Sequence, residues 1–135
     1  MGLVYTEITL KNAGDVADAG RGLIKTQEIR QTTVQALVDS GASTLVINDE
    51  VCKALGLKIE GSRLGVLADG TTQKNAVTEP VNIHWKNRDT VCKATVLPNG
   101  KVLLGAIPLQ DMDLIIHPSK HELCGAHGDE VQVYL

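Results

Sequence analysis

Apolar and polar residues alternate along much of the chain, a period of two that is typical of strands with one buried face. In TTVQALVD (residues 32–39), Val34, Ala36 and Val38 fall on one face of the predicted strand. The same pattern predicts a hairpin at 62–77 and strands at 3–10, 23–29, 43–47, 81–85, 91–97, 114–118 and 131–135. Strands therefore dominate the prediction.

Helical signals are few and short. The segment NDEVCKALGL predicts a helix of about two turns, with Asn48 as its N-cap and Gly56 as its stop. A second short helix is expected at 108–112, whereas the Gly- and Ala-rich segment 11–22 reads as a mobile loop. Many short strands with one or two short helices indicate an all-β, mainly antiparallel domain that forms a partly closed barrel.

Composition limits the size and content of the core. The 135 residues fit a single domain, spanning 1–135, that is long enough to bury a core without disulfides. The chain has no Phe, and its aromatic residues are Trp85, Tyr5 and Tyr134. The core must therefore be built mainly from aliphatic side chains, many of them β-branched, which also favours strands.

Charge and cysteine content narrow the partners and the compartment. The formal net charge is −3 and no Lys/Arg stripe is present, so we expect no nucleic-acid partner. No apolar run reaches the length of a membrane span, and we expect no membrane partner. The odd set Cys52, Cys92 and Cys124 forms no CxxC pair, and the first twelve residues contain no signal-peptide core. A cytoplasmic location with reduced thiols is the simplest interpretation.

One carboxylate interrupts a strongly aliphatic stretch, ALVDSGASTLVIN (residues 36–48). An ionised Asp39 between two apolar runs is costly unless hydrogen bonds, charges or a shared proton compensate it. Gly41 gives the backbone freedom for a tight turn that would project this carboxylate from the end of a strand, and Ser40 offers a hydroxyl to hold a facing loop. The position therefore calls for a functional explanation.

The sequence Asp39-Ser40-Gly41-Ala42 with its aliphatic flanks resembles the active-site loop of aspartic proteases. About sixty residues later, VLLGAIPL (residues 102–109) resembles the second signature of that family, and the order of elements between the two is that of the retropepsins. The resemblance covers roughly residues 25–118. It implies that Asp39 is catalytic, that the three residues after it form the active-site loop, and that no cofactor is needed.

The aspartic protease reaction needs two carboxylates that share one proton. The chain has no second D-[ST]-G, and Asp69, Asp111 and Asp113 lack the strand-then-turn context. The resemblance therefore implies a homodimer, in which Asp39 of each copy meets at a two-fold axis and cleaves a peptide or protein substrate. The alternative is a non-catalytic peptide-binding or dimerisation module that keeps the fold.

The hairpin around SRLGVLADGT is the candidate for a flap that closes over the substrate, with Gly65, Leu67, Ala68 and Asp69 as the predicted contact residues. An ordinary exposed hairpin is the competing interpretation, and the position of the flap tip stays open. The terminal strands at 3–10 and 131–135 are candidates for the dimer interface by the same resemblance.

A histidine-rich segment near the C-terminus suggests a different chemistry. His117, His121, Cys124 and His127 offer four ligands of the kind that zinc prefers, within eleven residues. The segment also contains Pro118, Gly125 and Gly128 and lacks a CxxC pair. We therefore expect no metal there.

Overall fold

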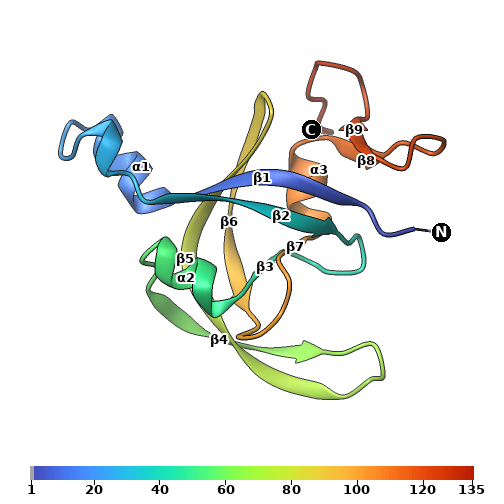
Figure 1. The fold of residues 1–135 in the computed structure, drawn as a ribbon, viewed down its shortest axis with the longest axis horizontal. Helices are drawn as coiled ribbons and strands as arrows, with labels where there is room; N and C mark the ends of the chain where they lie inside the picture. The colour runs from blue at the N-terminus through green and yellow to red at the C-terminus, as the bar shows by residue number, and fades with distance from the viewer. Residues whose placement is uncertain (1) are drawn as a thin grey trace.

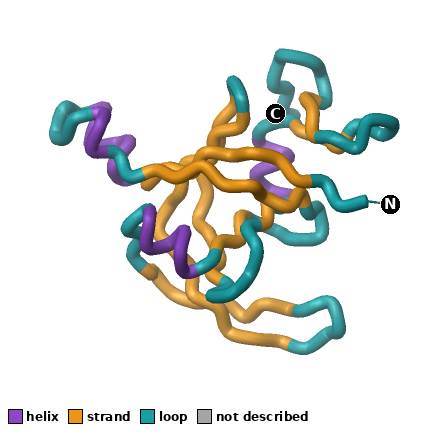
Figure 2. Tube along the Cα trace, in the orientation of Figure 1, coloured by secondary structure: helices purple, strands orange, loops and turns teal. Residues whose placement is uncertain are grey.

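The computed structural model describes residues 2–135, which form mostly strands with a few short helices (Figures 1 and 2). The strands are β1 (Tyr5–Asn12), β2 (Gln31–Val38), β3 (Leu45–Ile47), β4 (Ile59–Val66), β5 (Thr72–Trp85), β6 (Arg88–Val96), β7 (Leu103–Leu104), β8 (Leu114–Ile116) and β9 (Leu123–Gly125). The α-helices are α1 (Ala13–Gly20), α2 (Asp49–Ala54) and α3 (Ala106–Asp111), and a 3-10 turn, η1, spans Thr26–Glu28. The predicted all-β fold class is confirmed.

The main sheet has the order β1-β2-β7-β3-β6-β5-β4, and an additional pairing of β1 with β5 closes most of it into a ring. At the closing point Thr9 of β1 lies opposite both Thr33 of β2 and His84 of β5. The ring is not a regular barrel, because β7 runs parallel to β2 and antiparallel to β3, and β3 runs parallel to β6. β8 and β9 form a separate ribbon.

The core is aliphatic, as the composition predicts. Fully buried side chains come from strands on all sides of the ring and from α2, and they include Ile8, Leu10, Leu45, Ile47, Leu55, Ile83 and Leu104. Trp85 also lies in this core, and its indole N–H donates to the Thr6 hydroxyl at 2.8 Å. Burial of these side chains provides the main driving force that holds the ring together.

Three expectations from the sequence were wrong. Residues 11 and 12 continue β1, and the remainder of the predicted loop 11–22 holds helix α1, because the Asn12 side chain caps it by accepting from the Asp15 N–H at 3.0 Å. Residues 23–29 form no strand but contain η1. Residues 131–135 form no strand either, while the unpredicted β9 pairs with β8.

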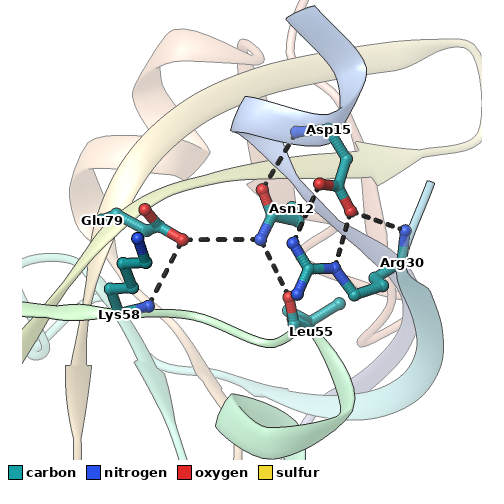
Figure 3. A network of polar contacts seen from close by, with 6 residues as sticks. All are labelled: Asn12, Asp15, Arg30, Leu55, Lys58 and Glu79. Atoms are coloured by element: carbon teal, nitrogen blue, oxygen red, sulfur yellow. Dashed lines mark hydrogen bonds and ion pairs between the residues drawn. The ribbon is translucent and has the colours of Figure 1, made fainter. Parts of the chain in front are cut away.

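A polar network joins α1, β2 and α2 near the N-terminal end of β2 (Figure 3). Arg30 binds the Asp15 carboxylate through Nε at 2.8 Å and Nη2 at 2.9 Å. These hydrogen bonds, opposed only in part by burial, lower the pKa of Asp15. Asn12 Nδ2 donates to the Leu55 carbonyl at 2.9 Å, so the same network holds the end of α2.

None of the helices in residues 2–135 is long and apolar enough to cross a membrane. The three cysteines are free thiols, and burial raises the pKa of Cys92 and of Cys52.

Candidate active site

Asp39 directly follows β2, at the point where that strand lies beside β7. Its backbone N–H donates to the Leu104 carbonyl at 3.0 Å, which continues the parallel pairing of β2 with β7. Its carboxylate Oδ1 accepts the Gly41 N–H at 2.9 Å, and its carbonyl accepts the Ala42 N–H at 3.1 Å. The half-buried carboxylate is therefore held by the backbone of its own turn, as the D-S-G-A pattern predicts.

The loop from Asp39 to Thr44 must pass over the start of α3, because β7 lies between β2 and β3. The Ala106 N–H donates to the Ala42 carbonyl at 2.8 Å, and the Ile107 N–H donates to the Ser43 carbonyl at 2.9 Å. These two bonds join the D-S-G-A turn to the LLGAIPL segment. The two signatures of the sequence therefore form one structural unit.

Gly105 makes this crossing possible for a steric reason. Its φ of −91° is accessible to any residue, but a Cβ there would lie 2.2 Å from the Thr44 carbonyl oxygen and 2.7 Å from that of Ala42. Both are backbone atoms that cannot rotate away. Glycine is therefore required for the loop and the helix start to touch.

A groove of about 430 Å³ lies between the active-site loop and the β4–β5 hairpin. It is lined by Gly41, Ala42, Ser43, Thr44, Val46, Arg63, Leu64, Gly65, Val66, Leu67, Asn75, Thr95 and Leu97. Its wall begins at Gly41, whose N–H binds the Asp39 carboxylate. The hairpin and the active-site loop therefore share one groove, and the role of the hairpin as a flap stays a prediction.

The turn of the hairpin spans residues 67–71. The Leu67 N–H donates to the Thr71 carbonyl at 2.7 Å, and Gly70 adopts a positive φ of 85°. The Asp69 carboxylate accepts from the Thr71 hydroxyl at 2.6 Å and from its N–H, and these bonds lower the pKa of Asp69. The tip therefore consists of Ala68, Asp69 and Gly70, and the long hairpin arm that carries it is visible at the lower right of Figure 1.

The predicted flap residues divide into two groups. Gly65 and Leu67 line the groove, whereas Ala68 and Asp69 lie at the exposed tip and do not. Ser40 is also exposed, and within residues 2–135 its hydroxyl forms no hydrogen bond to a facing loop. Sequence reasoning missed the groove residues of β6, such as Thr95, because no motif marks them.

The other candidate aspartates, Asp111 and Asp113, form hydrogen bonds away from the groove. Asp111 accepts a short hydrogen bond from the Thr90 hydroxyl, and Asp113 pairs with His127. Among residues 2–135 no Asp or Glu side chain lines the groove itself, and Asp39 is linked to it through its hydrogen bond from the groove-lining Gly41. The chain therefore places one carboxylate, that of Asp39, at this site.

The four residues of the histidine-rich segment have separate roles. His127 Nδ1 lies 2.7 Å from Asp113 Oδ2, an interaction that lowers the pKa of Asp113, and His117 Nδ1 accepts from the Lys120 N–H at 3.2 Å. Cys124 lies in β9. Over the part of the chain that the structure describes, no three His, Cys, Asp or Glu side chains gather as a metal site would require.

Comparison with known proteins identifies the class. The family profile described as aspartyl protease matches residues 26–107, which include both the D-S-G-A turn and the LLG segment. The chain therefore belongs to the aspartyl protease family, and the predicted resemblance is confirmed.

The similarity to an individual solved structure is lower than the match to the family profile suggests. Among solved structures, the chain is similar to the EIAV protease complexed with the inhibitor HBY-793, at 27% sequence identity and a TM-score of 0.47, over 59% of this chain and 77% of that one. No curated protein matches the sequence.

Proposed function

We propose that the chain is a homodimeric aspartic endopeptidase in which the Asp39 carboxylates of two copies activate one water. The observation that carries the proposal is the position of Asp39. Asp39 is held by Leu104 and by Gly41, and Gly41 lines the groove between the active-site loop and the β4–β5 hairpin. Family membership supports a peptidase of this kind.

The chemistry follows from two carboxylates that keep one proton between them. The ionised carboxylate removes a proton from water as the water oxygen attacks the peptide carbonyl carbon, and the protonated one donates to the carbonyl oxygen. The tetrahedral diol then collapses: the carboxylic acid that took the water proton donates it to the leaving nitrogen as the C–N bond breaks, and the other carboxylate takes one diol hydroxyl proton, which restores the pair with one shared proton. Activity should therefore show a bell-shaped pH profile, because both the fully ionised and the fully protonated pair are inactive.

The surface around Asp39 supports a second copy as the source of the second carboxylate. The Val38 N–H donates to the Val4 carbonyl, so the N-terminal arm runs beside the site and carries Leu3, which is 69% exposed. Ile107 of α3, whose N–H donates to the Ser43 carbonyl of the active-site loop, is 55% exposed. In Figure 1 the arm and α3 lie on the same side of the molecule. An apolar rim around a lone carboxylate is suited to an isologous contact.

Cleavage by matched preparations of wild type and Asp39→Asn tests the chemistry. In a broad peptide library assayed from acid to neutral pH, wild type should cleave and the variant should lose several orders of magnitude in rate while remaining folded. If a wild-type dimer cleaves nothing, the chain is a peptide-binding module. Equal cleavage by both proteins would place the activity elsewhere.

Sedimentation of surface variants tests the dimer. Ile107→Asp should shift the protein to monomer and abolish cleavage, because it buries a new charge at each contact. Val91→Asp is the matched control, since Val91 is 52% exposed on β6 and should tolerate the charge. Wild type that is monomeric at every concentration would remove the proposed dyad.

A further inference from the structure

The groove under the hairpin carries a single formal charge. Its walls are otherwise apolar or neutral, and Arg63 of β4 is its only ionised residue. Within residues 2–135 the guanidinium of Arg63 takes part in no ion pair or hydrogen bond, whereas Arg30 and Arg88 both bind protein acceptors. Arg63 therefore brings five N–H donors to a residue position that lines the groove, and none of them has an acceptor in the described chain.

A second unused donor lies beside this one. Asn75 is the register partner of Arg63 on β5, and such cross-strand neighbours have Cβ atoms about 5 Å apart. The Asn75 Oδ1 accepts from Gln73 Nε2 at 2.8 Å, while its Nδ2 has no acceptor in the described chain. Nδ2 lies over Gly65, 3.0 Å from where a Cβ would be, so the missing side chain leaves it uncovered. The unused donors of the pair are therefore the Arg63 guanidinium and the Asn75 Nδ2.

We infer that Arg63, assisted by Asn75, selects peptide substrates that carry Asp or Glu close to the cleaved bond, an inference that rests on the proposed function. A carboxylate supplies acceptors only and matches the fork of the guanidinium. The groove ends at the turn that holds Asp39, so the acidic residue lies within a few positions of the cleavage point. In a symmetric dimer the second copy repeats Arg63, and the preference therefore extends to both sides of the bond.

The test uses extended peptides in matched sets, in which one position at a time is fixed as Glu, Gln or Lys. Wild type should cleave the best Glu peptide with a kcat/KM about two- to fivefold above its Gln counterpart at low salt, and added salt should reduce the ratio. Arg63→Met should bring the ratio to one, and Arg63→Glu should turn the preference toward Lys. The change should appear mainly in KM, because Arg63 binds the substrate and not the reacting atoms.

Lys74→Met is the matched control. Lys74 is an exposed cation on the same hairpin, opposite Leu64, but it does not line the groove. This variant removes the same charge and should keep the preference for Glu. Loss of the preference in Lys74→Met as well would show a general effect of net charge and overturn the inference.

A binding measurement separates this inference from the proposed function. The Asp39→Asn protein should bind labelled Glu peptides more tightly than Gln peptides, and additional replacement of Arg63 by Met should remove the difference. If wild type cleaves nothing but this binding difference persists, the proposed function fails and the recognition by Arg63 stands. If wild type cleaves Glu and Gln peptides equally and binding shows no difference, the inference is wrong and the protease proposal is unaffected.

Discussion

Replacing Gly105 with alanine tests whether the crossing of the active-site loop over α3 is as tight as the structure shows. The new Cβ would fall 2.2 Å from the Thr44 carbonyl oxygen, well inside van der Waals contact, and the neighbouring atoms are all backbone. The loop and the helix start must therefore separate. The hydrogen bonds from Ala106 and Ile107 to the loop carbonyls would lengthen or break.

The expected loss of stability follows from these contacts. Overpacking at a rigid site costs about 1–3 kcal/mol, and each backbone hydrogen bond contributes about 1 kcal/mol, so the free energy of unfolding should fall by about 3–5 kcal/mol. For a domain of this length that corresponds to a decrease in Tm of roughly 10–15 °C. The loss is a large fraction of the stability of about 5–15 kcal/mol that domains have.

Denaturant unfolding at one fixed protein concentration measures the effect, because a dimer would make the midpoint depend on concentration. Gly61→Ala is the control: Gly61 lies in β4, its φ is not positive, and no atom lies within 4 Å of a Cβ placed there. The control should change stability by less than about 0.5 kcal/mol. If Gly105→Ala is as stable as Gly61→Ala, the described contact between the loop and α3 is wrong.

Three further outcomes are expected. Asp15→Asn should lower the free energy of unfolding at neutral pH by about 1–2 kcal/mol, a value that allows for solvent screening at the half-exposed Arg30. Folding lowers the Asp15 pKa, so the difference from wild type should shrink as the pH falls below the ordinary Asp pKa and should vanish below the lowered one. A difference that does not depend on pH would contradict the ion-pair explanation. Gly70→Val, at a φ of +85°, should reduce peptide turnover per folded molecule far more than Gly128→Val at a φ of +69° in the C-terminal segment, and equal turnover would make the hairpin a bystander. Purified protein should contain far less than one zinc per chain and keep its Tm in chelator, whereas stoichiometric zinc lost on unfolding would restore a metal site at 117–127.

The part of the fold that sequence predicted best is the part where local signals and the core agree. Asn48 caps α2 by accepting from the Val51 N–H, and Gly56 ends the helix with a φ of +59°, both as expected from residue type. The strand at 32–39 matched because its alternation follows its burial, with Ala36 and Val38 inward. In these segments the neighbouring residues alone determine the conformation.

The failures come from contacts distant in sequence. The helix in the Gly- and Ala-rich segment after β1 has a local cap in Asn12, which the sequence reading overlooked, and Arg30, fifteen residues later, adds the bonds that hold the Asp15 carboxylate. The C-terminal segment after β8 is held by Arg88, whose buried guanidinium donates to the carbonyls of Met112, Asp113 and Gly128. Periodicity carries no information about the partners of Arg30 and Arg88, so these distant contacts were not predictable.

In the candidate site, too, the local motifs were predictable and the contacts between distant segments were not. The turn at Asp39 is a local motif, and its link to the LLG segment follows from the second motif. Arg63 and Asn75 attract no notice in the sequence, because an arginine and an asparagine in an exposed hairpin are ordinary. Only the strand register, which places them opposite each other, and the groove beside them give these residues a role.

The polar network that contributes to stability and the candidate catalytic residue Asp39 lie at opposite ends of β2. Arg30 of the Asp15–Arg30 pair directly precedes the strand and Asp39 directly follows it, so at about 3.3 Å per residue these two residues are roughly 30 Å apart along the strand. Asp39 is fixed at its own end by Leu104 and Gly41, and within residues 2–135 neither of these forms a hydrogen bond with the polar network. Weakening that network should therefore reduce the fraction of folded protein without moving the carboxylate in the molecules that remain folded. Gly105 has the opposite character, because it is a direct part of the crossing that positions the loop, and a change there alters the site and the stability together.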